Sequence, residues 1–286
     1  MRIILSVNSR LTYKVIFYNK NNILFIIVIK GRGDREMFSA LDRSGKLIDV
    51  DIAIKNPDSK YYCRSCGGEL IIKKGNVRIK HFAHKNKCTC DDYHENMSEW
   101  HRYWQKKFPI RNREVPLKID DSILQTSFIE CLKKTERRAD ILCYGYVIEF
   151  QNSPITSKEF NERTWFYNAL GKKVVWIFNM IEEYKNEKIQ LIEERYNKGD
   201  NGGKYSWKYA SKTFINYDSY DNDVILIFQV AEVDNKETDI EQGYFERVIW
   251  AINSNNDKDT NFKRFFTSYY PGNFTELMQK IQAREL

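Results

Sequence analysis

Two short segments near the middle of the chain alternate between hydrophobic and polar residues. Residues 138–143 and 146–151 are rich in isoleucine, valine and aromatic residues, which favours β-strands. Between them, Tyr144 and Gly145 can form a two-residue turn, because glycine readily adopts a positive φ. The pattern therefore predicts a β-hairpin.

The short turn fixes the register of this hairpin. The expected pairs are Leu142–Val147, Ile141–Ile148, Asp140–Glu149 and Arg138–Gln151. Alternation then places Glu149 and Gln151 on one face and Phe150 on the other, where it faces a core. A slip of one residue would instead send Asp140 and Glu149 to opposite faces.

In this register the two acids are direct neighbours, with β-carbons about 4.5–5.5 Å apart. Like charges in that arrangement destabilise a sheet. A hard divalent cation such as Mg²⁺, which takes oxygen ligands, would offset the repulsion between Asp140 and Glu149. The alternative is a surface hairpin whose acids are neutralised by Arg137, Arg138 or nearby lysines.

A helix is predicted before the hairpin. Trp100, Trp104 and Phe108 recur every four residues, which indicates a helix with one buried face. Asn96 or Ser98 can cap its first turn. The helix would therefore dock its aromatic residues on the predicted sheet.

After the hairpin the pattern predicts a second helix and another strand. Thr156 or Ser157 begins the helix, Gly171 ends it, and residues 174–178 form a buried strand. A strand–helix–strand unit favours a parallel pair with a right-handed crossover. The expected fold class is α/β, with an α+β mixed sheet flanked by helices.

A group of cysteines and histidines precedes these elements. Cys63 and Cys66 form a CxxC pair, and His81 and His84 follow after two short strands expected at residues 69–73 and 77–80. Placed at the start of a helical turn, the two histidines would share a face. Two thiolates and two imidazoles make a closed tetrahedral zinc site of the structural kind.

The fourth zinc ligand is less certain than the others, because the HxxH spacing is tighter than usual. Cys88 and Cys90 are the alternative ligands. Either set predicts a treble-clef-like zinc finger that needs its metal to fold. The competing interpretation is a set of reduced thiols with two histidines used in packing.

Composition and charge fit a protein that handles nucleic acid. The chain has 286 residues, 42% of them hydrophobic, and carries a net charge of +7. A basic chain suits a polyanionic partner, and DNA is the expected one. Because Lys, Asn, Ile and Tyr are frequent along the whole sequence, the net charge by itself is a weak signal for DNA binding. Its longest apolar run, residues 23–29, is too short to span a membrane, so we expect no membrane partner and a cytoplasmic location.

The two ends of the chain are harder to interpret. Residues 1–36 are expected either to precede the natural start at Met37 or to form an extra β-hairpin that caps the core.

Toward the other end we expect a charged helix at 181–197, a loop at 198–204, strands at 212–218, 223–233 and 244–252, and a helix from Asn273. Aromatic residues here could stack on unpaired bases, although a small aromatic core is the simpler explanation. These residues are Trp207, Tyr209, Phe265, Phe266, Tyr269 and Tyr270.

The order of several short motifs resembles a known family. They are "MFSALDRSGKLI", "CRSCGGELIIKKG", "HFAH", "SEWHRYW", "RRADI", "VIEFQNSPI" and "ERTWFYNA". Together they resemble competence protein CoiA and CoiA-like nucleases of the PD-(D/E)XK nuclease superfamily. The resemblance runs from about Met37 to Phe178.

The resemblance implies a role for each candidate residue. Glu99 would be the helix acid, Asp140 the central metal ligand, and Glu149 the second carboxylate. Gln151 would occupy the position usually held by lysine, and Arg138 would restore the missing positive charge at the scissile phosphate. Without the resemblance, Glu99 is typical of an acid favoured by the helix dipole, and His101 on the same helix is typical of a packing residue.

The expected organisation has four parts: residues 1–36; a hairpin and zinc-finger module at 37–95; a restriction-endonuclease-like core at 96–180; and an α+β extension at 181–286. The expected function is hydrolysis of DNA phosphodiester bonds by a nuclease that uses one or two Mg²⁺ or Mn²⁺ ions. Its setting would be the processing or recombination of incoming or foreign DNA, in competence or defence, with recombination or defence proteins as partners. One alternative is a catalytically silent zinc-finger DNA-binding protein, and another is an interaction protein whose C-terminal aromatic residues dock a partner.

Overall fold

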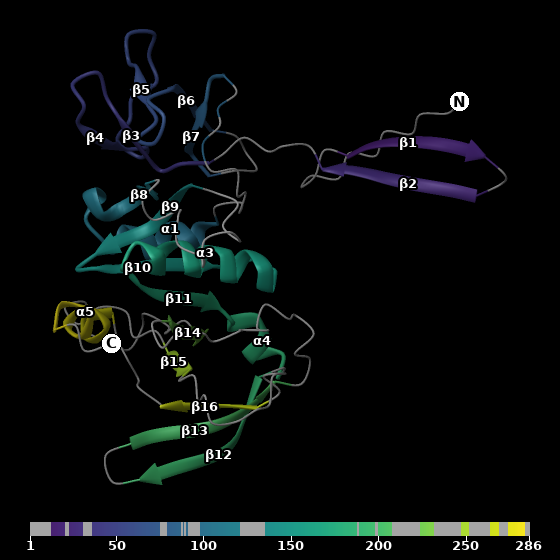
Figure 1. The fold of residues 1–286 in the computed structure, drawn as a ribbon, viewed down its shortest axis with the longest axis vertical. Helices are drawn as coiled ribbons and strands as arrows, with labels where there is room; N and C mark the ends of the chain where they lie inside the picture. Colours follow the sequence, from purple (N-terminus) through teal and green to yellow (C-terminus); the bar gives the residue numbers. More distant parts are fainter. Residues whose placement is uncertain are drawn as a thin grey trace.

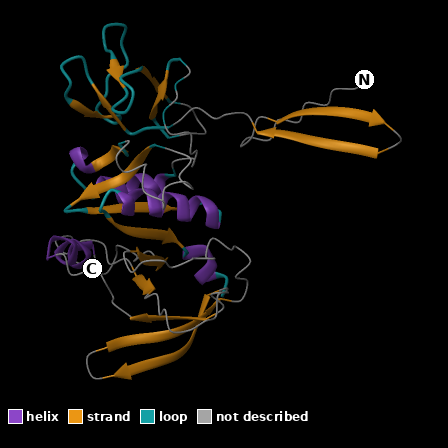
Figure 2. Ribbon diagram, viewed as in Figure 1, coloured by secondary structure: helices purple, strands orange, loops and turns teal. Residues whose placement is uncertain are grey.

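The structure is a computed structural model, and its secondary structure is summarised in Figures 1 and 2. It describes residues 13–20, 23–30, 36–74, 79–86, 88, 90, 98–120, 135–187, 189–197, 200–207, 224–231, 247–251, 264–268 and 274–283. Within this part of the chain, strands outnumber helices and belong to three sheets. No helix in the described part is long and apolar enough to cross a membrane.

The smallest sheet is the hairpin expected in residues 1–36. Its strands are β1 (Tyr13–Lys20) and β2 (Ile23–Lys30), which pair antiparallel. Among the described strands they pair only with each other, so this hairpin adds no strand to the other two sheets (Figure 1).

The second sheet forms the N-terminal module and has the order β4-β3-β5-β6-β7. Its strands are β3 (Ser39–Leu41), β4 (Leu47–Asp49), β5 (Tyr61–Tyr62), β6 (Glu69–Lys73) and β7 (His81–His84). Phe38, Ala40 and Phe82 are among the buried residues of its small hydrophobic core. The second strand of the predicted finger hairpin was expected at residues 77–80. The strand that pairs with β6 begins instead at His81.

The third sheet has nine strands in the order β12-β13-β16-β15-β14-β11-β10-β9-β8. The strands are β8 (Arg113–Lys118), β9 (Glu136–Cys143), β10 (Tyr146–Gln151), β11 (Lys173–Asn179), β12 (Ile189–Asn197), β13 (Asp200–Trp207), β14 (Val224–Ala231), β15 (Arg247–Ala251) and β16 (Arg264–Ser268). Strands β10, β11 and β14 run parallel, while the other neighbours are antiparallel. The predicted mixed sheet is therefore present, and β14, which corresponds to the strand predicted at 223–233, extends it on the far side of β11.

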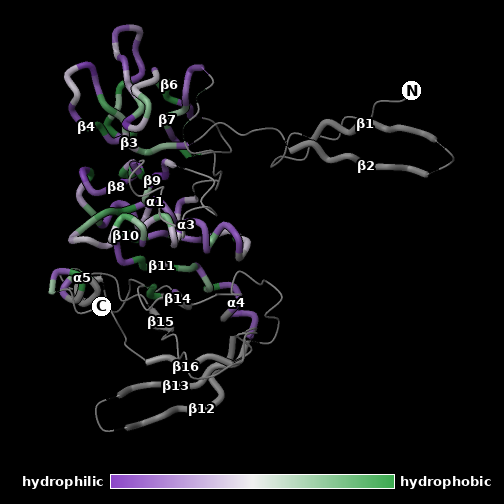
Figure 3. Tube along the Cα trace, viewed as in Figure 1, coloured by the Kyte–Doolittle hydropathy of each residue, from purple (hydrophilic) through white to green (hydrophobic). Residues whose placement is uncertain are grey.

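Helices pack on both faces of this sheet. They are α1 (Glu99–Lys106), α3 (Ser157–Ala169), α4 (Ile181–Lys185) and α5 (Phe274–Ala283), with a short 3₁₀ helix, η1 (Ile110–Asn112), after α1. The side chain of Ser98 caps α1, and that of Thr156 caps α3. Figure 3 shows hydrophobic positions along β11, the strand between β10 and β14.

The core on one face joins α1 and α5 to the central strands. Trp104 and Phe108 pack there with residues of β9, β10 and β11, including Phe150, whose ring stacks on Trp104. On the opposite face, Phe160 of α3 packs against Trp176 of β11 with ring centroids 4.8 Å apart. The central strands are thus buried on both sides, which explains their nearly continuous apolar sequence.

The predicted helix over residues 181–197 is wrong for most of its length. Helix α4 ends at Lys185, and β12 follows from Ile189 to Asn197. Residues 189–197 form antiparallel hydrogen bonds with β13, which also takes up most of the loop predicted at 198–204. Pairing with a neighbouring strand outweighs the helical propensity of a charged segment. The strand predicted at 212–218 and the aromatic residues Tyr209, Tyr269 and Tyr270 lie outside the described residues.

Candidate functional site

The predicted hairpin forms with the predicted turn and initial register. Tyr144 and Gly145 both have positive φ, 49° and 89°, as a type I′ turn requires. Cys143 pairs with Tyr146, and the next two pairs are Leu142–Val147 and Ile141–Ile148. The turn chemistry therefore sets the start of the ladder as the sequence predicted.

The ladder between β9 and β10 ends just before the two acids. The Asp140 carboxylate accepts a hydrogen bond from the backbone N–H of Phe150 at 2.9 Å, so a side chain takes the place of the next strand-to-strand bond. Asp140–Glu149 and Arg138–Gln151 are consequently not backbone pairs, while on the other edge of β9 Arg138 pairs with Pro116 of β8. The acids lie where the two strands separate.

Asp140 is held from the α1 side of this opening. Nε2 of His101 lies 3.0 Å from Oδ2 of Asp140, and the Gln105 amide donates to Oδ1 at 3.5 Å. Burial raises the pKa of Asp140, but His101, the backbone hydrogen bond and Arg163 outweigh that effect. The net result is a pKa below the ordinary range for aspartate, so Asp140 is ionised at neutral pH.

Glu149 is held from the α3 side. Arg163 forms a buried ion pair with Oε2, and the Tyr167 hydroxyl also stabilises the charged carboxylate. Oε1 is buried and has no hydrogen-bond partner of normal geometry among the described residues. Burial, with a further contribution from Asp140, raises the pKa of Glu149 to about 7 against the opposing effect of Arg163. Two interacting acids with pKa values displaced in opposite directions are typical of functional sites.

The surface-hairpin alternative is wrong, because both acids are shielded from water. Glu149 is 2% exposed, and the side chain of Asp140 is 13% exposed. Arg137, proposed as a neutralising residue, lies instead beside Glu159 and Glu162 of α3, with its Nη1 2.8 Å from the Glu159 carboxylate.

Three of the predicted site residues lie in other surroundings than expected. Gln151 is buried, and its amide donates to the carbonyl of Ser153 at 2.6 Å. Arg138 donates to the carbonyl of Glu36 at 3.2 Å and faces Glu114, so Arg163 is the arginine beside Glu149.

Glu99, the third of these residues, is exposed in the first turn of α1. The residues of α1 that reach Asp140 are His101 and Gln105. These two residues are four positions apart and lie on the buried face of the helix, whereas Glu99 lies on its exposed face. The structure therefore brings Asp140 and Glu149 together with His101 and Arg163, and leaves Glu99 apart from them.

Sequence reasoning missed Arg163 and Gln229. Oε1 of Gln229 on β14 accepts hydrogen bonds from the indole N–H groups of Trp100 at 2.7 Å and Trp104 at 2.9 Å, which fixes α1 on the sheet. Arg163 and Tyr167 are four residues apart on α3, and this spacing was the available signal for a polar face turned toward Glu149. Nothing local in the sequence connects Gln229 to α1.

The raised pKa of Glu149 predicts how stability changes with pH. Between the ordinary value for glutamate and about pH 7, the folded protein keeps a proton that the unfolded chain has released. The free energy of unfolding should therefore fall as pH rises through this window, by at most about 1.4 kcal/mol per pH unit. Urea unfolding with zinc present and Mg²⁺ absent measures the slope. Glu149→Gln should flatten it, and an unchanged slope in that variant would contradict the assignment.

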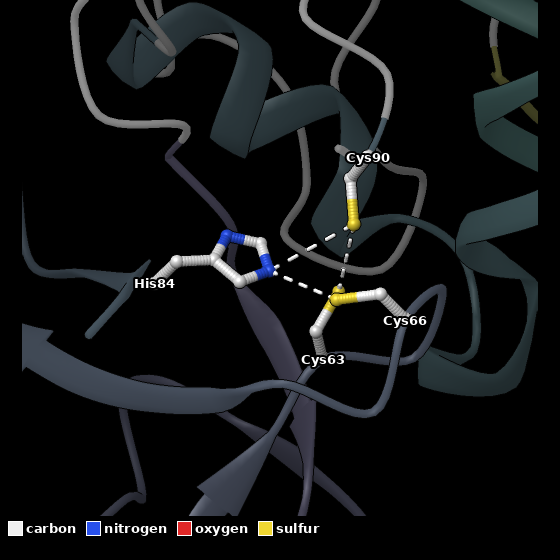
Figure 4. Close-up of side chains that lie close together, drawn as sticks. All are labelled: Cys63, Cys66, His84 and Cys90. Carbon is white, nitrogen blue, oxygen red and sulfur yellow. Dashed lines mark hydrogen bonds between the residues drawn. The ribbon is translucent and has the colours of Figure 1, made fainter. Parts of the chain in front are cut away.

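A second cluster lies in the N-terminal module. The ligand atoms of Cys63, Cys66, His84 and Cys90 all lie within 4.8 Å of one another (Figure 4). Sγ of Cys63 is 3.8 Å from Sγ of Cys90, and Nε2 of His84 is 3.4 Å from Sγ of Cys66. A tetrahedral zinc ion with bonds of about 2.3 Å to sulfur and 2.0–2.1 Å to nitrogen needs separations of about 3.8 Å and 3.6 Å. The cluster therefore has the dimensions of a Cys₃His zinc site.

Backbone hydrogen bonds support thiolates in this cluster. The N–H of Ser65 donates to Sγ of Cys63, and the N–H of Gly68 donates to Sγ of Cys66, both at 3.4 Å. Gly67 between them adopts a positive φ of 70°, which lets the CxxC turn close. Donors aimed at sulfur favour the charged ligand that zinc needs.

The predicted ligand His81 lies outside the cluster, and Cys90, one of the two alternatives, lies within it. His81 and His84 belong to strand β7 and not to a helical turn, so side chains three residues apart point to opposite faces. His81 is buried and its Nδ1 donates to the carbonyl of Ile79 at 2.8 Å, while Cys88 is exposed and outside the cluster. Among the described residues, no other set of three Cys, His, Asp or Glu ligand atoms gathers as closely.

The fold and the two clusters define a class of protein. A mixed sheet with a parallel crossover carries two acids shielded from water, and a module with a Cys₃His cluster lies beside it, as in a nuclease-like α+β protein. Residues 50–92 match the N-terminal domain of competence protein CoiA, and residues 123–246 match the nuclease-like domain of the same protein. The chain belongs to the CoiA family. The second match supports a restriction-endonuclease-like fold and suggests a nuclease-like role in competence, with nucleic acid as the partner. No curated protein and no solved structure matches the chain.

Proposed function

We propose that this protein is a metal-dependent nuclease that hydrolyses phosphodiester bonds in DNA. The observation that carries the proposal is the pair of interacting acids, Asp140 and Glu149, which are shielded from water at the point where β9 and β10 separate. The match to a nuclease-like domain supports the reaction class. The natural setting would be the processing of incoming or foreign DNA, in competence or defence.

The residues present fit a hard divalent cation. Mg²⁺ is commonly bound by one or two carboxylates and keeps several waters, so Asp140 and Glu149 are a sufficient pair. Glu149 has a buried oxygen, Oε1, that accepts no hydrogen bond of normal geometry from the described residues. When bound, Mg²⁺ or Mn²⁺ supplies a more acidic water and neutralises charge on the phosphate.

The surrounding residues keep the acids in place. His101 orients Asp140, and Arg163 orients Glu149 and supplies the positive charge that lysine would provide in related sites. Gln151 can offer only an amide hydrogen bond, and in the free protein this amide is engaged with Ser153. The main catalytic contributions of the protein would be positioning and fixed electrostatics.

We also propose that Cys63, Cys66, His84 and Cys90 bind a structural zinc ion. All four ligands come from protein side chains, so the site is closed and leaves no position for a substrate. The module has a small core, and a metal would contribute much of its folding free energy.

The test of the function is a cleavage assay on a matrix of substrates and metals. Purified protein is incubated with single- and double-stranded DNA and RNA, with Mg²⁺, Mn²⁺ or Ca²⁺, or with no divalent cation added besides zinc. We expect cleavage of DNA that needs Mg²⁺ or Mn²⁺. Absence of cleavage of every substrate with every metal would reject the nuclease proposal.

A catalytically silent DNA-binding protein is the second candidate. Two observations favour it: Gln151 stands where lysine is usual, and Arg163 already neutralises Glu149. Isothermal titration calorimetry with Mg²⁺ and Mn²⁺ separates the candidates. A nuclease should bind these ions at a site that disappears in Asp140→Asn, while a protein that only binds DNA has no need of that site.

A further inference from the structure

The N-terminal module contacts the nuclease-like sheet through a group of charged residues. Asp49, the last residue of β4, forms ion pairs with Arg102 of α1 and with Arg113 of β8, the latter at 2.9 Å. Asp51 adds contacts with Arg102 at 2.9 Å and with Lys106 at 2.7 Å. The side chain of Arg102 is 9% exposed and that of Asp49 is 17% exposed, so this contact is shielded from solvent.

Helix α1 joins this contact to the acids of the candidate site. His101 and Arg102 are consecutive, and successive residues on a helix point about 100° apart. His101 reaches Asp140, while Arg102 reaches Asp49 in the module. The same helix turn is therefore bound on one side to the candidate site and on the other to the module.

A second connection passes from a proposed zinc ligand to β9. Arg64 follows Cys63 directly, and its guanidinium donates to the carbonyls of Arg113 at 2.9 Å and Arg111 at 3.2 Å. Arg113 pairs with Ile141, the neighbour of Asp140 in β9. The side chain of Arg113 also donates to the carbonyl of Lys106, the last residue of α1, at 3.0 Å and to that of Phe108 at 2.6 Å.

Glu114 closes the interface between the module and the sheet. Its buried carboxylate accepts hydrogen bonds from the backbone N–H of Phe38 at 3.0 Å and from the N–H and hydroxyl of Ser39, both at 2.6 Å. Glu114 also has a positive φ of 49°, which is uncommon for a residue other than glycine and must be held by its surroundings. Buried, satisfied polar groups of this kind favour one fixed orientation of the module.

From these contacts we propose that Asp49 is a positioning residue for the candidate nuclease site. The proposal rests on the proposed function. Asp49 holds Arg102, Arg102 fixes the rotation of α1, and that rotation sets the place of His101 against Asp140. The Cys₃His module therefore serves the reaction without touching the substrate, because it supports the helix that orients a proposed metal ligand.

The test compares Asp49→Asn with Asp58→Asn, an exposed aspartate in the same module. Loss of an outer-shell partner of a metal ligand commonly costs 10–100-fold in activity or metal affinity, and Asp49 acts on such a partner through Arg102 and α1, so we expect kcat in Asp49→Asn to fall by about tenfold, the lower end of that range. KM for DNA and zinc content should stay near the wild-type values. Asp58→Asn should match the wild type in all three measurements.

Nuclear magnetic resonance of the imidazole nitrogens gives a readout that does not depend on cleavage. The His101 signals, assigned with His101→Gln, should shift in Asp49→Asn and stay unchanged in Asp58→Asn. If the wild type proves inactive, the nuclease proposal fails, while this shift still supports or overturns the positioning role. Unchanged His101 signals and unchanged kcat in Asp49→Asn would overturn it.

A second variant keeps the test decisive if Asp49→Asn does not fold. Arg102→Lys retains the charge and the helix, but lysine has no donor at the position of Nη2, the single guanidinium nitrogen that contacts both Asp49 and Asp51. The same fall in kcat and the same shift of the His101 signals are expected. A folded Arg102→Lys protein with wild-type kcat and His101 signals would overturn the proposal.

Discussion

Replacing Asp140 by asparagine should lower the rate of metal-dependent DNA cleavage by at least about a thousandfold. The charge of a central ligand contributes several kcal/mol to metal binding and to stabilisation of the transition state, and each 1.36 kcal/mol corresponds to a tenfold change in rate. Asparagine has nearly the same shape as aspartate and retains an oxygen for the N–H of Phe150. The variant should therefore keep the separation of β9 and β10, and the measured loss would report charge rather than unfolding.

The matched control for this experiment is Glu99→Gln. Glu99 is an acid on the same helix that contacts Asp140 through His101, but it is exposed. Its replacement should change the cleavage rate less than about threefold, because a screened surface charge contributes little. Rates are measured as initial velocities at saturating Mg²⁺ with thermal unfolding recorded in parallel. Equal cleavage by wild type and Asp140→Asn would show that Asp140 takes no part in the reaction. A large loss of cleavage in Glu99→Gln would support Glu99 as the helix acid implied by the family resemblance.

The hairpin shows how far local sequence determines the site. A two-residue turn with glycine at its second position leaves few alternative registers for the hairpin, so the first three residue pairs of β9 and β10 could be predicted. The opening at Asp140 could not, because it depends on a side chain that competes with the backbone for the N–H of Phe150. That competition depends on three-dimensional contacts with His101 and Gln105, which come from a helix thirty-five and more residues earlier.

The partners of the acids illustrate the same limit. The helix that carries Arg163 was predicted from its cap and its terminal glycine, but the direction of Arg163 depends on how α3 lies on the sheet. Gln229 accepts from two tryptophans of α1 although its strand was predicted without any link to that helix. Periodicity predicts which face of an element is buried, while the partner on the other side follows only from the order of strands in the sheet.

The residues of the Cys₃His cluster were partly predictable because CxxC brings two sulfurs together through local geometry alone. The choice between His81 and Cys90 depended on the secondary structure assumed for residues 81–84. A helical turn would have brought both histidines to one face, whereas the observed strand β7 separates them. The strand forms because residues 81–84 pair with β6, a contact made across a hairpin whose length the sequence did not fix.

Two variants distinguish the proposed Cys₃His ligand set from the set that includes His81. Cys90→Ser should lose zinc, because removing a ligand should cost more than the 10–100-fold in affinity typical of an outer-shell partner. Structural zinc sites contribute about 10–16 kcal/mol of apparent binding free energy, so the N-terminal module should unfold in this variant. His81→Asn should keep zinc, since asparagine offers an N–H near the position of Nδ1 for the carbonyl of Ile79. Zinc content by atomic absorption and hydrogen exchange of residues 37–90 measure both effects.

The two variants also separate a zinc defect from a defect in the candidate site. Cys90 lies in the module, whose contacts with α1 run through Asp49 and with β8 through Arg64. If the module unfolds in Cys90→Ser, both contacts are lost, and cleavage should fall although Asp140 and Glu149 are intact. Restoration of cleavage by excess zinc would tie the loss to the metal, because a ligand defect weakens binding without destroying the acids. Loss of zinc in His81→Asn together with its retention in Cys90→Ser would contradict the proposed set and identify His81 as the fourth ligand.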